Sequence, residues 1–217
     1  MNDYKGIFSL LIFCIEFVLI INVIIFSKSK FKSNVLIILS LLTAYQFFEF
    51  LICGLNLQLS FVIYLAFVSI TFLPPSGLIL ALKVNRITKS KYTGLIYSPA
   101  LFFTIYYLLT MKYFRVRECS VVYASYHYPL GFLYGLFYYL PIILTLLILG
   151  RGFITQTDKT LKRQNIILLI GFLTFLLPMI VTLFIYPSSI EFIESLMCKF
   201  AFALALIITY FALYFKK

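Results

Sequence analysis

Three ionisable side chains stand inside long apolar stretches of this 217-residue chain: Glu16, Glu49 and Lys199. A charge inside a lipid bilayer costs at least a few kcal/mol, so it usually faces the interior of a helix bundle and finds a partner there. At about 1.5 Å per residue, each of the three lies roughly 10–15 Å from the same side of the expected bundle. We therefore expect one intramembrane polar cluster, which marks a candidate functional site.

Neighbouring polar residues extend this cluster. Gln46 and Glu49 share one helix face, and Ser195 lies one turn from Lys199. Helices one, two and seven are commonly neighbours in a closed seven-helix ring, an analogy that brings these charges together. Three interpretations are open: a polar pocket that binds an unknown small ligand, a buried Glu–Lys ion pair that only fixes helix packing, or a proton or ion path.

The composition requires a membrane protein around this cluster. Hydrophobic residues make up 63% of the chain and charged residues 12%, against about 45–50% and 25% in soluble domains. Soluble enzymes and soluble nucleic-acid-binding proteins are thereby excluded, and the lipid bilayer is an expected partner. A transmembrane helix needs about 20 apolar residues. The apolar stretches predict an all-α bundle of seven transmembrane helices forming one domain, 1–217, with spans at about 6–27, 35–56, 59–82, 95–113, 128–149, 166–186 and 192–215.

The net charge of +11 reports orientation rather than nucleic-acid binding. Of the 18 Lys and Arg residues, 13 fall in the first, third and fifth loops and at the C-terminus, whereas four fall on the other side. By the positive-inside rule, the N-terminus is expected outside and the C-terminus in the cytoplasm, in a bacterial inner membrane. This orientation requires an odd number of spans.

Enzyme chemistry is not expected. The chain has one histidine, no phosphate-binding glycine loop and no metalloprotease motif, so we expect neither a metal nor a cofactor. Lys199 in a seventh helix invites comparison with the Schiff-base lysine of rhodopsins. The stretch 59–82 has no acidic counter-ion, however, and the chain has no Trp to line a retinal pocket.

Prolines interrupt the later spans and are candidate hinges, although the same kinks can simply shape the bundle. The hinge candidates are Pro74, Pro75, Pro141 and Pro178.

The segment 118–128, rich in Tyr and Ser, is expected outside, over the mouth of the bundle. Cys119 lies in this loop, and Cys53 and Cys198 lie near the same side. A disulfide from Cys119 to either of them is geometrically open, and free thiols are the alternative.

Several short motifs carry a family resemblance. They are the run 65–75 ending in Pro74-Pro75, the pairs Ser98-Pro99 and Arg163-Gln164, and the segments 129–131, 166–178, 187–189 and 198–201. Together they resemble the seven-helix membrane-sensor region at the N-terminus of many bacterial histidine kinases and diguanylate cyclases. The resemblance implies a sensor or receptor-like module that detects an extracytoplasmic or intramembrane stimulus. Because Lys217 follows directly on the last span, the signal is expected to pass to a separate cytoplasmic protein, unless the chain is part of a longer one.

A small seven-helix transporter of a small solute is the alternative function. Such transporters are built from two three-helix repeats with matched prolines. Here the first three spans have prolines only in the third, whereas the fifth and sixth each have one. This mismatch favours the sensor.

Overall fold

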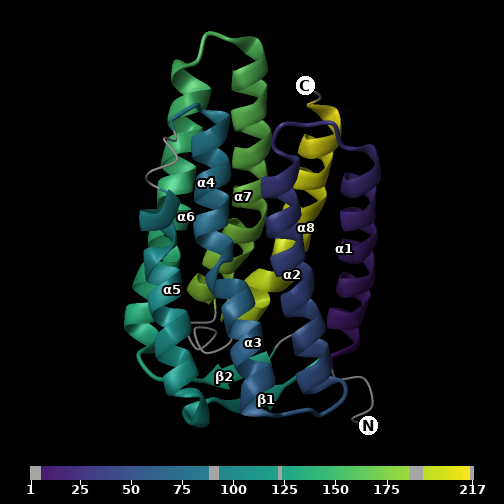
Figure 1. Ribbon diagram of the computed structural model, residues 1–217, viewed down its shortest axis with the longest axis vertical. Coiled ribbons are helices and arrows are strands. Elements are labelled where there is room, and N and C mark those ends of the chain that lie inside the picture. The colour runs from purple at the N-terminus through teal and green to yellow at the C-terminus, as the bar shows by residue number, and fades with distance from the viewer. Residues whose placement is uncertain (1–5, 88–92, 122–123, 186–192, 216–217) are drawn as a thin grey trace.

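A computed structural model describes residues 6–87, 93–121, 124–185 and 193–215, and it is a helical bundle (Figure 1). The chain is 81% helical, which confirms the predicted all-α class. Among the described residues, six helical stretches are long and apolar enough to cross a membrane. The predicted motifs at 187–189 and the last two lysines lie outside the described residues.

The elements follow one another with short connections. They are α1 (Ile7–Phe26), α2 (Lys32–Cys53), α3 (Ser60–Thr71), α4 (Leu73–Val84), α5 (Thr93–Leu109), the 3₁₀ turn η2 (Met111–Tyr113), β1 (Arg115–Cys119), β2 (Ala124–His127), α6 (Gly131–Thr155), α7 (Lys159–Ile185) and α8 (Ile193–Tyr214). Helices α3 and α4 together make one of the six apolar stretches, and α5, with 17 residues, is a shorter apolar helix.

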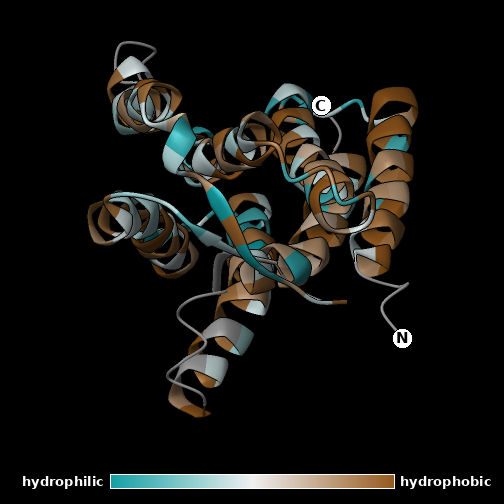
Figure 2. Cartoon of the chain, turned by 90° about the horizontal axis from the view of Figure 1, so that it is seen from below, coloured by the Kyte–Doolittle hydropathy of each residue, from teal (hydrophilic) through white to brown (hydrophobic). Residues whose placement is uncertain are grey.

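Apolar side chains cover these helices on most sides. Large hydrophobic residues such as Phe132 and Phe184 are 90% and 84% exposed, respectively. Viewed from the hairpin end, the helices are mostly hydrophobic, and hydrophilic residues gather on the strands and on short helical stretches (Figure 2). In a hydrocarbon environment only a helix or a closed barrel satisfies every backbone polar group internally. A hydrocarbon environment therefore accounts for both the apolar surface and the helical backbone.

The first and last helices of the chain lie side by side in the bundle. Helix α1 packs against both α2 and α8, and α2 also packs against α8 (Figure 1). The expected proximity of the first, second and last spans is thus confirmed. Helix α7 joins α8 to α6, α4 lies between α2 and α6, and α5 packs on α3 and α4.

The span predicted at 59–82 matches the apolar stretch Ser60–Val84, but the structure interrupts its helix at Phe72, between α3 and α4. Pro74 and Pro75 lie in the first turn of α4 rather than inside a helix. A proline has no N–H to donate to the preceding turn, but the first turn of a helix has no intrahelical acceptor to lose. Pro141 and Pro178, by contrast, lie inside α6 and α7.

A β-hairpin crosses the end of the bundle near the N-terminus, where only a loop was expected (Figure 1). Strands β1 and β2 pair antiparallel, with Arg115 opposite His127 and an irregularity between Val116 and Glu118. Beneath it lies the aromatic ring of Phe67, whose centroid is 5.7 Å from that of Tyr126. The hairpin is therefore packed onto the bundle.

Candidate functional site

An ion pair between Lys199 of α8 and Glu49 of α2 forms the centre of the site. The ammonium nitrogen lies 2.8 Å from Glu49 Oε1, and the two side chains are 4% and 2% exposed. Breaking a buried pair by removing one partner leaves an uncompensated charge. The two helices are thus held in register at this level.

Two further side chains complete the surroundings of the ammonium group. Lys199 Nζ donates to Ser9 Oγ at 2.7 Å and to Gln46 Oε1 at 2.8 Å. With Glu49, these acceptors match the three N–H groups of a lysine. Gln46 uses its amide nitrogen to donate to the backbone carbonyl of Cys198 at 3.0 Å. The cluster therefore ties α1, α2 and α8 together.

Ser9 was not among the candidates from the sequence. It lies on α1, fully buried, and its hydroxyl donates to Glu49 Oε1 at 3.2 Å. A signal was present, because Ser9 precedes Glu16 by seven residues, which is two helical turns and therefore the same face. A serine in an apolar helix is common, so this spacing alone does not single it out.

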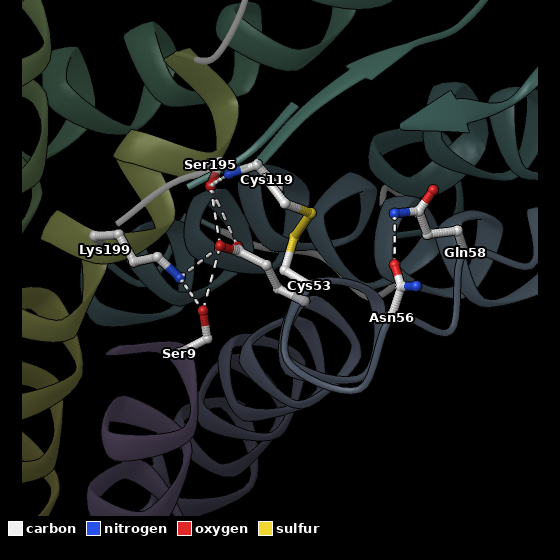
Figure 3. The surroundings of a disulfide bond; sticks show 9 residues. Ser9, Cys53, Asn56, Gln58, Cys119, Ser195 and Lys199 are labelled. Carbon is white, nitrogen blue, oxygen red and sulfur yellow. Dashed lines mark hydrogen bonds and ion pairs between the residues drawn. A yellow bond between two sulfur atoms is a disulfide. The ribbon is translucent and has the colours of Figure 1, made fainter. Parts of the chain in front are cut away.

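Ser195 links the cluster to the hairpin. Its hydroxyl lies 3.2 Å from each carboxylate oxygen of Glu49 and accepts a hydrogen bond from the backbone N–H of Ala124 at 3.0 Å. Figure 3 shows Ser9, Ser195 and Lys199 approaching one carboxylate from different sides. Strand β2 is thus one side chain away from the ion pair.

A disulfide between Cys53 and Cys119 links the other strand to α2 (Figure 3). Of the two partners expected for Cys119, the structure has Cys53, and Cys198 is buried and takes no part in a disulfide. The two bonded cysteines are 66 residues apart in the chain, and their Cα atoms are 5.5 Å apart. Both strands of the hairpin are therefore fastened beside the cluster.

Glu16 is buried but stands apart from the cluster. Neither of its carboxyl oxygens has a hydrogen-bond partner among the described residues. Thr43 lies beside it, and the Thr43 hydroxyl donates to the carbonyl of Leu39 at 2.8 Å. Since Thr43 precedes Glu49 by six residues on α2, Glu16 lies about 9 Å deeper than the ion pair. Of the three charges, Glu49 and Lys199 thus form a direct ion pair, whereas Lys199 acts on Glu16 only by electrostatic attraction at longer range.

At Met197 and Cys198 of α8, the bundle holds a small cavity of about 40 Å³. Its lining is mostly apolar and includes Pro74, Tyr138, Phe172, Met197 and Cys198. About 10–15 Å³ is needed per water molecule, whereas drug-sized ligands occupy sites of about 300–1,000 Å³. None of the five cluster residues lines this cavity, and the charges of Lys199 and Glu49 are satisfied by protein groups.

The hinge candidates are distributed around the interior. Pro74 lines the cavity just described, whereas Pro75 and Pro141 line a second one of about 20 Å³, next to Tyr138. Pro178 is a partly buried residue of α7.

Within the described ranges, no three His, Cys, Asp or Glu side chains come close enough to hold a metal ion. The cluster has one carboxylate, one ammonium group, two hydroxyls and one amide, all engaged with one another. This arrangement joins three helices and a hairpin. No protein-family model and no curated protein matches the chain.

Proposed function

We propose that this protein is a multi-pass membrane sensor in which the β-hairpin receives a stimulus and the Lys199–Glu49 pair transmits it to the helices. The observation that carries the proposal is the Ser195 hydroxyl, which binds both the hairpin backbone at Ala124 and the Glu49 carboxylate. Moving the strand removes a donor from Ser195 and alters its bond to Glu49. A stimulus at the membrane surface is thereby converted into a change in a buried ion pair.

We further propose that the bundle has seven spans, with the N-terminus outside. Six stretches satisfy the length and hydropathy of a span, and the 17-residue apolar α5 supplies the seventh if its ends lie near the membrane surface. An odd number agrees with the start of α1 and the end of α8 lying at opposite ends of the bundle (Figure 1).

Two independent features support this orientation. The hairpin end has few described basic residues, namely Lys112, Arg115 and Arg117, whereas the opposite end has nine: Lys28, Lys30, Lys32, Lys83, Arg86, Arg151, Lys159, Lys162 and Arg163. The hairpin end also contains the disulfide, and disulfides persist in oxidising, extracytoplasmic compartments. Reporter fusions at residue 56 should be active outside the cytoplasm. A cytoplasmic signal there contradicts the orientation.

The output is expected at the opposite end of α7 and α8. There Arg163 donates to the Tyr214 hydroxyl at 2.7 Å, and its guanidinium carbon lies 4.6 Å from the centroid of that ring. A shift of α8 at Lys199 is carried along a continuous helix to this contact. The family resemblance implies a cytoplasmic output, and a separate cytoplasmic signalling protein is the proposed recipient.

Hydrogen–deuterium exchange of the full chain in lipid nanodiscs tests this coupling without knowledge of the ligand. Loosening the hairpin with Cys53→Ala and Cys119→Ala should raise exchange in the hairpin, in the first turns of α8 and near Tyr214. Ser98→Ala is a control, because Ser98 bonds only locally, to Leu95 at 2.8 Å, on the exposed face of α5. A change confined to the hairpin contradicts the proposed transmission.

The same preparation separates sensing from transport. Proteoliposomes that contain the protein should take up small solutes, including sugars, no faster than protein-free liposomes. Saturable uptake that Lys199→Met abolishes would support a transporter instead.

A further inference from the structure

A groove opens sideways from the bundle between α2 and α5. It has a volume of about 350 Å³ and is almost entirely apolar, and its lining residues are Ile37, Leu41, Phe72, Ser76, Tyr97 and Leu101. Helix α5 is held on the far side of the groove by Tyr97, whose hydroxyl lies 3.0 Å from Ser76 Oγ. Because α5 packs on α3 and α4, it leaves this face of α2 uncovered.

The groove continues into a hollow at the beginning of α2. This hollow has a volume of about 800 Å³ and shares Ile37 and Leu41 with the groove. Its other end is polar and basic, with Ser29, Lys30, Lys32 and Ser33. One continuous depression therefore has a basic mouth and an apolar interior.

Its length matches one leaflet of a bilayer. Leu41 follows Ser33 by eight residues of α2, or about 12 Å along the helix axis. Half of the hydrocarbon thickness of a bilayer is about 15 Å. With the basic mouth at the headgroup level, the apolar groove lies at the depth of the acyl chains.

The mouth is suited to a negative charge. Helix α2 begins at Lys32 with no side-chain cap and no acidic residue in its first turn, so the positive end of its dipole is not neutralised. Lys32 Nζ donates to the carbonyl of Ile24 at 2.7 Å, which leaves two of its N–H groups for another acceptor. Lys30 is exposed, and the segment from Ser27 to Ser33 has no acidic residue.

We propose that this depression binds one anionic phospholipid, with its phosphate at Lys30, Lys32 and the first turn of α2 and one acyl chain along Ile37 and Leu41. A zwitterionic lipid has a cationic headgroup, which the two lysines repel. The inference needs neither the orientation nor the sensor role proposed above.

The absence of Trp from the chain allows a direct test with one engineered tryptophan. Ile37→Trp places the reporter in the groove. Ile21→Trp on α1 is the matched control, since it is also five residues from its helix terminus at the same end, and the two isoleucines are 44% and 41% exposed. Each variant is reconstituted with dibrominated phosphatidylglycerol or dibrominated phosphatidylcholine in unlabelled lipid, and quenching is titrated.

At position 37 the quenching titrations should show an affinity for the anionic lipid about five- to thirty-fold higher than for the zwitterionic lipid. At position 21 the two lipids should quench alike. Adding Lys30→Gln and Lys32→Gln to Ile37→Trp should reduce the preference to the value at position 21. Native mass spectrometry should show the wild-type chain retaining phosphatidylglycerol more strongly than a Lys30→Gln, Lys32→Gln chain, which needs no reporter. If the two lipids quench equally at position 37, as they should at position 21, the groove has only an ordinary lipid annulus, and the proposal is overturned. A dimer in which neither lipid reaches position 37 also overturns it, because a second copy then covers the groove.

Discussion

Cys53 and Glu49 lie four residues apart on α2, so the disulfide that fastens the hairpin ends about 6 Å along the helix from the carboxylate that binds Lys199. The second strand reaches the same carboxylate through Ser195. The hairpin therefore has two separate attachments to one buried charge, and each can be removed without touching the other.

Removing the lysine of the ion pair should be far more costly than removing the whole pair. Lys199→Met leaves Glu49 charged, buried and without its main partner, and it should lower the free energy of unfolding by about 3–5 kcal/mol. The double variant Lys199→Met, Glu49→Gln should recover most of that loss. Thermal unfolding in detergent measures both. Additive losses in the double variant would contradict a direct interaction.

Ser195→Ala should release the hairpin from the cluster. The variant removes the acceptor of the Ala124 N–H and one donor to Glu49, and it should destabilise the protein by about 1–3 kcal/mol. Exchange of the amide of Ala124 should accelerate, while the disulfide is retained. An unchanged rate at Ala124 would show that Ser195 does not hold the strand.

The disulfide predicts a simple thiol count. In the unfolded, unreduced chain an alkylating reagent should modify Cys14 and Cys198 alone, and after reduction it should modify all four cysteines. Replacing Cys53 and Cys119 by alanine should lower stability by about 2–5 kcal/mol, because the bond closes a long loop. Four reactive thiols before reduction would rule out the pairing.

Replacing Glu16 by methionine should not lower the melting temperature, whereas the same replacement of Glu49 should. The Glu16 carboxyl is buried with no hydrogen-bond partner in the described part of the chain, so Glu16→Met removes a polar group that is costly to bury. The melting temperature should stay the same or rise, whereas Glu49→Met should lower it. A loss of more than about 2 kcal/mol for Glu16→Met would mean that Glu16 has a stabilising partner.

Two glycines of α6 offer a matched comparison at the other end of the bundle. A Cβ at Gly152 would lie 2.7 Å from Asn165 Oδ1 and would also strike Asn85, and these two asparagines exchange amide hydrogen bonds of 2.7 and 3.1 Å. Gly152→Ala should therefore destabilise the protein by about 1–3 kcal/mol. Gly150 has open space around its Cβ position, so Gly150→Ala should be neutral or stabilising by up to about 1 kcal/mol. Equal melting temperatures for the two variants would contradict the close packing at Gly152.

Much of the fold follows from the sequence. Long apolar stretches predict helices, because a backbone in hydrocarbon must satisfy its own hydrogen bonds, and the stretches fall where the helices lie. The break at Phe72 was missed, since hydropathy does not distinguish a proline inside a helix from one that begins a new helix. The hairpin was missed as well, because its five- and four-residue strands follow tertiary packing on Phe67 more than a strong alternation of apolar residues.

The candidate site, like the fold, was predicted only in part from the sequence. Glu49 and Lys199 were identified because a charge in an apolar helix is costly, and that cost depends only on local sequence. Gln46 was identified because it shares a helix face with Glu49. Other features of the site depend on which faces of α1, α2 and α8 meet beneath the hairpin. They are the contact of Ser9, the bridging role of Ser195 and the pairing of Cys119 with Cys53 rather than Cys198. A hydrogen bond or a disulfide has a reach of a few ångströms, so contacts across as many as 190 residues of chain, as between Lys199 and Ser9, exist only once the helices are packed. The sequence determined that charges would be buried, and the tertiary structure decided that two of them pair directly while the Glu16 carboxyl has no hydrogen-bond partner among the described residues.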